Sequence, residues 1–114
     1  KYFRKIEEKI TFQIIKKKNA VIALGGGAFI NNAIRKKVLK TCISIWLKVS
    51  LEKLLVRYKR NNRRPLLDKK KMEINVKKIY QTRKNIYRLA NFKVNCDNIN
   101  KTQIVDKILV FYEN

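Results

Sequence analysis

The spacing of apolar residues along this chain changes between helical and strand-like patterns. From Phe3 to about Lys17, apolar residues recur every three or four positions, which predicts a helix with an apolar side at Phe3, Ile6, Ile10 and Ile14. Residues 20–24 form a short continuous apolar run, as expected for a strand buried on both faces. Residues 42–49 are β-branched and aromatic and predict a second strand, and residues 92–96 predict a third.

Helices are predicted between and after these strands, at about residues 32–40, 51–58, 72–89 and 100–112. Asn31 or Asn32 can cap the first of these helices, and Ser50 can cap the second. The basic segment 59–71 holds the single proline and is predicted to be a mobile loop. The last helix carries apolar residues on one face, at Ile104, Val105, Ile108 and Tyr112.

The order of these elements indicates a fold class. Strands that alternate with helices imply a parallel sheet covered by helices on both faces, a three-layer α/β/α arrangement. A chain of 114 residues with no internal repeat or linker is one small domain or a piece of one. No apolar run reaches the length of a membrane span, and the first ten residues lack the apolar region of a signal peptide.

The net charge and the cysteine and histidine content exclude some kinds of site, but they do not by themselves indicate a partner. A net charge of +21 raises nucleic acid or an anionic membrane as a partner. We discount both, because lysine is spread along the whole chain and the runs at 16–18 and 68–71 are expected to face solvent. The chain has no histidine, which excludes histidine-based triads and, with only Cys42 and Cys96, a zinc site. Both thiols are expected to lie in the core of a cytosolic protein.

All three glycines of the chain stand in a row, as Gly25, Gly26 and Gly27. A row of this kind after an apolar run indicates a close approach to the backbone or several positive φ angles. A loose strand-to-helix turn is the plainer alternative.

Three arginine-containing patterns suggest anion binding. Arg83 falls in the middle of the apolar stripe of its helix, so it must reach the surface, pair with a core carboxylate or bind a ligand anion. Arg4 and Glu7 are three residues apart, so Glu7 can hold the guanidinium or form an ordinary surface pair. The segment 63–67 (RRPLL) places arginines on a loop that can close over phosphate oxygens, or is a solvated charge cluster.

Taken together, these patterns resemble the shikimate kinases, a family of small P-loop kinases. The resemblance rests on four segments in the same order: YFRKIEE, VIALGGGA, the Arg57–Leu67 pattern R......RPLL, and Arg83–Tyr87. It implies transfer of the γ-phosphate of ATP to the 3-hydroxyl of shikimate, on the way to chorismate and the aromatic amino acids. It also implies a P-loop NTPase-like fold, Mg²⁺, a cytoplasmic location and a monomer.

The resemblance implies a role for each matching residue. Arg4 and Arg83 would grip the shikimate carboxylate, and Glu7 would orient Arg4. Gly25, Gly26 and Gly27 would lie against the substrate, with the Gly26 N–H donating to it.

On the nucleotide side, Arg64 would be the lid arginine that reaches the ATP phosphates and acts in catalysis. Arg57 would stack on adenine, and Asn100, or else Asn98, would belong to the adenine loop. These assignments leave the metal ligands outside the 114 residues.

The sequence departs from the family pattern in one large respect. It contains no GxxGxGK[ST] loop and none of the residues upstream of YFR, where the family has its candidate catalytic aspartate. In a strand order resembling 2-3-1-4-5, the three predicted strands are the third, fourth and fifth, and the central P-loop strand is missing. We therefore interpret residues 1–114 as the C-terminal part of one domain, with a shikimate-binding region at about 1–30 and a lid at about 57–71. Alone it is expected to fold poorly and to be inactive.

Three other readings remain at this stage. Another small-molecule P-loop kinase, such as a gluconate kinase, shares the class but not the FR..E and RPLL patterns. A basic nucleic-acid-binding module explains the charge but not the glycine row or Arg83, and its basic runs lack interleaved aromatic residues. A non-working remnant of a kinase is the third.

Overall fold

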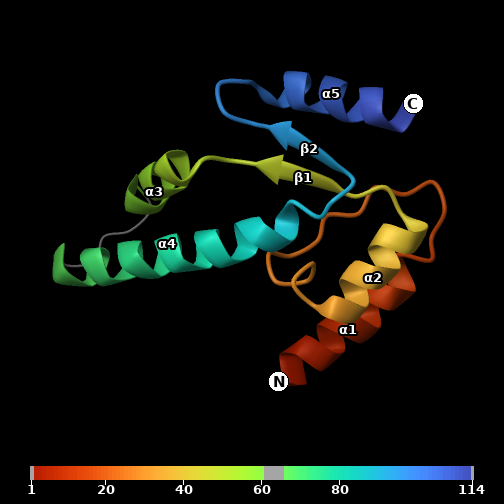
Figure 1. The fold of residues 1–114 in the computed structure, drawn as a ribbon, viewed down its shortest axis with the longest axis horizontal. Helices are drawn as coiled ribbons and strands as arrows, with labels where there is room; N and C mark the ends of the chain where they lie inside the picture. Colours follow the sequence, from red (N-terminus) through yellow and green to blue (C-terminus); the bar gives the residue numbers. More distant parts are fainter. Residues whose placement is uncertain (1, 61–65, 114) are drawn as a thin grey trace.

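The computed structural model describes residues 2–60 and 66–113 and contains five helices and two strands among them (Figure 1). The predictions for Arg63, Arg64 and Pro65 therefore concern residues outside the described part of the chain. The elements in chain order are α1 (Tyr2–Ile14), α2 (Asn32–Thr41), β1 (Ile45–Lys48), α3 (Leu51–Arg60), α4 (Leu66–Tyr87), β2 (Phe92–Asn95) and α5 (Lys101–Glu113).

The sheet consists of β1 and β2, which run parallel with Ile45 opposite Phe92. Ser44 and Asn91 fix this register just before the strands begin: the Ser44 N–H and hydroxyl both donate to Asn91 Oδ1 at 2.9 Å, and the Asn91 N–H donates to Ser44 Oγ at 2.9 Å. Ser44 is buried, so this reciprocal pairing satisfies polar groups that water does not reach. The predicted parallel pairing of residues 42–49 and 92–96 is thus confirmed over four residues of each.

The predicted first strand, residues 20–24, is wrong for the described part of the chain. The segment runs without strand hydrogen bonds, and Val21 is fully exposed, while Ile22 and Leu24 pack against the core. A strand needs a neighbour that pairs with its N–H and C=O groups, and no described strand lies beside this run. The apolar character of residues 20–24 was therefore not sufficient to make this segment a strand.

The core lies where the end of α1, the loop after the glycine row and α2 meet. Its buried members are Ile15, Ala28, Phe29, Ile34 and Val38. Asn31 caps α2, because its Oδ1 accepts from the N–H groups of residues 33 and 34, and its Nδ2 donates to Glu8 of α1 at 3.0 Å. This side chain settles the choice between Asn31 and Asn32 and ties α2 to α1.

The α1 helix turns a different face to the core than its apolar spacing predicts. Phe3, Ile6 and Ile10 are exposed, whereas Thr11 and Ile15 are buried. At 100° per residue, the inward face is the one that also carries Arg4, and it is largely polar. The helix itself is confirmed, but its orientation is set by what this polar face contacts.

The last helix differs from the prediction in a similar but smaller way. The ring of Phe111 on α5 stacks on Phe92 of β2 with centroids 4.4 Å apart. Val105 and Tyr112 of the predicted face are mostly exposed, while Ile104 and Ile108 are half-buried. The packed side of α5 is therefore shifted towards Phe111.

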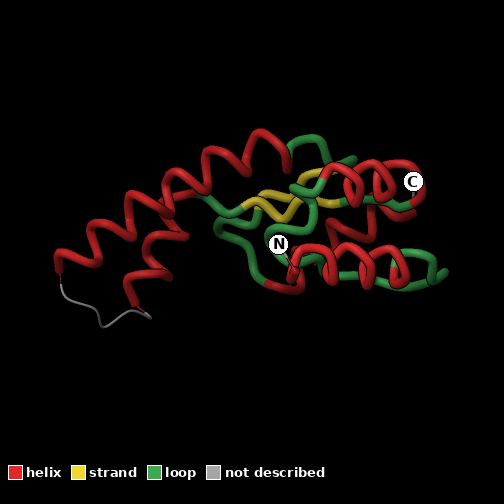
Figure 2. Tube along the Cα trace, turned by 90° about the horizontal axis from the view of Figure 1, so that it is seen from below, coloured by secondary structure: helices red, strands yellow, loops and turns green. Residues whose placement is uncertain are grey.

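The helices α3 and α4 extend together away from the rest of the chain (Figure 2). The Tyr58 hydroxyl contacts the Met72 sulfur at 2.9 Å, and Glu73 lies 3.6 Å from Lys59 and 3.7 Å from Lys77. Residues 66–71 belong to α4 and not to a loop, so the predicted loop 59–71 is wrong at that end. Asp68 in the first turn of α4 favours this earlier start, because a negative charge is stabilising at a helix N-terminus.

Because α3 and α4 extend away from the rest of the chain, the molecule is elongated. Its radius of gyration is 16.0 Å, against roughly 13 Å for a compact chain of this length. None of the described helices is both long enough and apolar enough to cross a bilayer.

Candidate functional site

The glycine row forms a tight turn between residue 24 and the core. The Ala28 N–H donates to the Gly25 carbonyl at 3.0 Å, and none of the three glycines has a positive φ. The row is therefore not required by left-handed backbone geometry. The other prediction, a close approach to the backbone, is the correct one.

Two guanidinium groups approach this turn. A Cβ atom at Gly26 would lie 2.7 Å from Arg83 Nη1, and a Cβ atom at Gly27 would overlap the Arg4 guanidinium. At Gly25 the nearest atom would be Glu7 Oε2 at 3.6 Å, which is an ordinary contact. Gly26 and Gly27 thus leave room for the heads of two arginines that are 79 positions apart in the sequence (83 − 4).

Arg4 is held by Glu7, as their spacing predicts. Arg4 Nη1 donates to Glu7 Oε1 at 2.9 Å, one turn apart on α1. The Glu7 side chain is 17% exposed and that of Arg4 is 54% exposed. The carboxylate is therefore the fixed partner, and the arginine keeps donors directed elsewhere.

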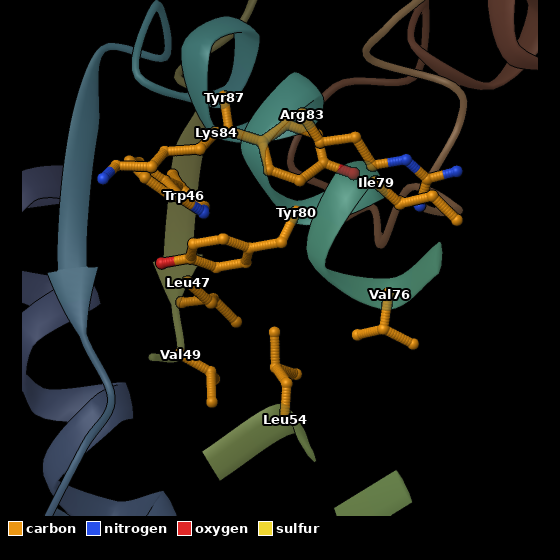
Figure 3. A pocket seen from close by; sticks show the side chains of 10 residues that line it. All are labelled: Trp46, Leu47, Val49, Leu54, Val76, Ile79, Tyr80, Arg83, Lys84 and Tyr87. Atoms are coloured by element: carbon orange, nitrogen blue, oxygen red, sulfur yellow. The ribbon is translucent and has the colours of Figure 1, made fainter. Parts of the chain in front are cut away.

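Arg83 lies in the wall of a cleft of about 280 Å³ between β1, α3 and α4 (Figure 3). The cleft is mostly apolar, with Trp46 and Tyr80 among its lining residues. Arg83 is half-buried, and among the described residues no carboxylate pairs with its guanidinium. The alternative of a core carboxylate partner is therefore wrong for the described part of the chain.

Tyr87 is the contact residue whose role the sequence did not reveal. Its hydroxyl donates to the Gly26 carbonyl, and its ring lies 6.4 Å from that of Phe29 and 6.1 Å from that of Trp46. It stands one helical turn after Arg83, and Figure 3 shows its hydroxyl and the Arg83 guanidinium directed to the same side of α4. The sequence signal was present in the Arg83–Tyr87 motif, where Tyr87 read as an apolar stripe residue.

The turn is also a source of backbone donors. Within residues 2–60 and 66–113, neither the Gly26 N–H nor the Gly27 N–H has a protein acceptor. Two guanidinium heads therefore lie against a turn that also has two free N–H groups, and the Glu7 carboxylate pairs with one of the guanidinium groups. Such an arrangement suits a small anion with hydroxyl groups.

A second group of predicted residues gathers where α3 meets the loop after β2. The Ser50 N–H donates to Asp97 Oδ1 at 3.1 Å, and Lys53 Nζ donates to Asn98 Oδ1 at 3.1 Å. Asn100 caps α5: its Oδ1 accepts from the Gln103 N–H at 2.8 Å, and Gln103 Oε1 accepts from the Asn100 N–H at 2.9 Å.

The pKa of Cys96 depends on burial and on the charged side chains around this loop. Burial raises the pKa of the Cys96 thiol, and the neighbouring Asp97 carboxylate adds to the increase. The positive charge of Arg57 acts in the opposite direction, so the exposed Arg57 of α3 lies within electrostatic reach of this loop. Cys42 and Cys96 are both free thiols and half-buried.

Among the described residues, no group of three or more His, Cys, Asp or Glu side chains comes together in a way that could hold a metal ion. We derive no step through Mg²⁺ from these residues.

Comparison with known proteins gives this geometry a family. The family model for shikimate kinase matches residues 1–113. The chain belongs to the shikimate kinase family. Its fold is accordingly the P-loop NTPase-like α/β fold, to which the parallel β1–β2 pair and the surrounding helices conform.

Individual relatives carry the same name. A shikimate kinase of Bartonella henselae is 36% identical over 107 residues, which cover 94% of this chain and 51% of the relative. One of Bartonella quintana is 36% identical over 112 residues, covering 98% of this chain and 53% of the relative. One of a Sulfurihydrogenibium species is 39% identical over 108 residues, covering 95% and 64%. The chain spans about half to two-thirds of the length of these relatives, and no solved structure matches it.

In this member of the shikimate kinase family, the residues predicted to bind shikimate lie close together, whereas those predicted to bind the nucleotide are linked by fewer contacts. The residues predicted for shikimate meet around one turn: Arg4, Glu7, Gly25, Gly26, Gly27 and Arg83. Arg57 and Asn100 of the predicted nucleotide group lie beside the same loop, and Arg64 is outside the described residues.

Proposed function

We propose that this chain carries the shikimate-binding end of an enzyme that transfers the γ-phosphate of ATP to the 3-hydroxyl of shikimate. The observation that carries the proposal is the close approach of two guanidinium heads to the glycine turn, that of Arg83 at Gly26 and that of Arg4 at Gly27. A planar carboxylate matches guanidinium forks in charge and shape, and two forks fix its orientation as well as its position.

The glycine turn serves the same substrate in this proposal. Arg4 and Arg83 bind the carboxylate, Glu7 holds Arg4 in place, and the Gly26 N–H donates to a substrate oxygen. Gly25 and Gly27 complete a surface without side chains, against which the ring lies. Substrate specificity follows, because a polyol without a carboxylate leaves both guanidinium groups partly unpaired.

The nucleotide side is proposed on weaker contacts. Arg64 neutralises charge on the transferred phosphoryl group as the catalytic arginine of the lid, and Arg57 stacks on adenine. Asn100 contributes its side-chain nitrogen to the adenine loop, because its oxygen is engaged in capping α5. The phosphate-cradling loop, the base and the ligands of Mg²⁺ are not among the 114 residues, so we propose that this chain alone is inactive.

The wider setting follows from the same proposal. We propose a cytoplasmic monomer that feeds chorismate and aromatic amino acid synthesis, with no specific nucleic-acid or membrane partner. The charge of +21 then contributes only weak, salt-sensitive binding to polyanions.

The test uses the longest natural protein that contains this sequence, in an assay that couples ADP formation to shikimate. Shikimate-dependent turnover of ATP is expected, and gluconate should not replace shikimate. Arg83→Lys keeps the charge but loses the fork, so the KM for shikimate should rise about 10–100-fold. Arg88→Lys, an exposed arginine five residues later, is the matched control and should change it less than about twofold.

Two results would contradict the proposal. One is ATP turnover that is independent of shikimate or equally rapid with gluconate. The other is an equal response of the KM for shikimate to Arg83→Lys and Arg88→Lys.

A further inference from the structure

The central peptide of the glycine turn, between Gly26 and Gly27, has two orientations open to it. The Ala28 N–H bonded to the Gly25 carbonyl closes a four-residue turn in which Gly26 and Gly27 are the central residues. Turns of types I and II differ mainly in a flip of this central peptide, and type II requires a positive φ at its third residue. Glycine at both central positions adopts either form without steric cost.

The structure holds only one of these forms. Gly27 has no positive φ, so the turn is of the type I class. Because three glycines supply no side-chain preference, a contact from outside the turn can hold it in one form. The candidate for that contact is the hydrogen bond from the Tyr87 hydroxyl to the Gly26 carbonyl.

Tyr87 is well placed to act as a rigid donor. Its ring packs between Phe29 of the core and Trp46 of β1, with centroid distances of 6.4 and 6.1 Å. The last turn of α4, which carries it, also packs against the core through Ile86. The hydroxyl is thus fixed by contacts that do not involve the turn, and it can impose an orientation on the turn.

Fixing the Gly26 carbonyl also fixes the Gly27 N–H. In a planar trans peptide the C=O and the following N–H point in opposite directions. With the carbonyl bound by Tyr87, the Gly27 N–H is directed to the other side of the turn, where no acceptor in the described chain takes it. A flip would exchange this donor for a carbonyl oxygen, which repels an anionic oxygen of a ligand.

We propose that Tyr87 is a positioning residue that locks the Gly26–Gly27 peptide so that the Gly27 N–H faces the substrate. This inference rests on the proposed function for the identity of that substrate. Tyr87 itself does not contact the substrate. It acts through the backbone donor that it orients.

The test replaces Tyr87 with phenylalanine in the longest natural protein that contains this sequence. Tyr87→Phe keeps the ring contacts and removes only the hydroxyl. The KM for shikimate should rise about 5–10-fold, whereas kcat and the KM for ATP should change less than about twofold. Tyr112→Phe removes the hydroxyl of an exposed tyrosine on α5 and should change none of these values.

A second measurement reads the peptide directly. With ¹⁵N-labelled glycine, the Gly27 amide should give one signal in the unaltered protein and a broadened or doubled signal in Tyr87→Phe. An unchanged KM for shikimate and an unchanged Gly27 signal in Tyr87→Phe would overturn the inference. Two Gly27 signals in the unaltered protein would also overturn it, even if the variant failed to fold. Absence of shikimate-dependent turnover in the unaltered protein would instead overturn the proposed function, while the amide signals still decide the role of Tyr87.

Discussion

The two ends of the candidate site are built in different ways. At the glycine turn, side chains from α1 and α4 approach the backbone so closely that a Cβ atom at two of the three positions would displace an arginine head. At the loop after β2, the polar side chains mostly serve the fold: Asp97 receives the Ser50 N–H, and Asn100 caps α5. At the glycine turn, Arg83 has no carboxylate partner among the described residues, whereas the polar side chains named at the other end are engaged in hydrogen bonds.

This difference shows which end carries the functional argument. A guanidinium without a carboxylate beside a glycine backbone has no structural purpose that the described residues supply, so it points to a ligand. An asparagine that caps a helix is already accounted for by its cap. Residues that look equally polar in the sequence therefore carry unequal weight once their partners are known.

The largest effect is expected from adding a methyl group to the glycine turn at Gly27, with the same change at Gly25 as the matched control. In Gly27→Ala the new methyl group overlaps the Arg4 guanidinium and displaces it, so the KM for shikimate should rise about 10–100-fold, as expected for losing charged hydrogen bonds. In Gly25→Ala the new methyl group lies 3.6 Å from Glu7 Oε2, and the KM should change less than about threefold. Both glycines have φ values that alanine tolerates.

Thermal unfolding separates the cause. The displaced group is the flexible end of an exposed side chain, so the Tm of Gly27→Ala should stay close to that of Gly25→Ala. If both variants lose shikimate binding equally, or if Gly27→Ala simply unfolds, the close approach of Arg4 is not what the glycine is for.

The sequence predicted the helices and the two described strands well because each follows from local periodicity, and it predicted their parallel direction because a helix-containing crossover connects them. It failed where the outcome depends on a partner. The apolar run 20–24 is strand-like, yet it lacks a described neighbour to pair with, so its hydrogen-bonding groups form no ladder. Likewise, the apolar spacing of α1 predicted the wrong inward face, because the opposite face carries Thr11, which is buried, and Glu8, which accepts a hydrogen bond from Asn31.

The candidate site was predictable to the extent that its residues looked misplaced. Arg83 in an apolar stripe and three adjacent glycines each conflicted with ordinary helix or turn requirements, and the structure brings them together. Tyr87 gave no such conflict, because a tyrosine in an apolar stripe satisfies local rules. Its hydrogen bond to Gly26 depends on two segments 61 residues apart, which no local pattern encodes.

At the loop after β2, Asn100 has two roles that substitutions can separate: it caps α5, and it is proposed to contact adenine. Asn100→Ala removes the cap of α5 and should lower the free energy of unfolding by about 1 kcal/mol in urea denaturation. Asn100→Ser keeps a capping oxygen and should restore most of that stability. If Asn100 also serves the adenine loop through its side-chain nitrogen, the KM for ATP rises in both variants. An equal loss of stability in both variants would show that the cap is not what Asn100 contributes.

The smallest expected effect concerns Cys96, beside the same loop. Burial and then Asp97 raise the pKa of its thiol in the folded protein, so the unfolded state loses its proton first as the pH rises. The contribution of this thiol to stability is therefore complete below its ordinary pKa and is lost as the pH climbs from that value through the folded pKa. Cys96→Ser should remove this part of the alkaline slope, and solvent screening should keep the difference small because the thiol is only partly buried. Unfolding in urea at intervals from pH 7 to 10 measures it. A slope that is steeper in Cys96→Ser than in the unaltered protein would mean that the positive charges of Arg57 and Lys107, which lower the same pKa, outweigh burial and Asp97.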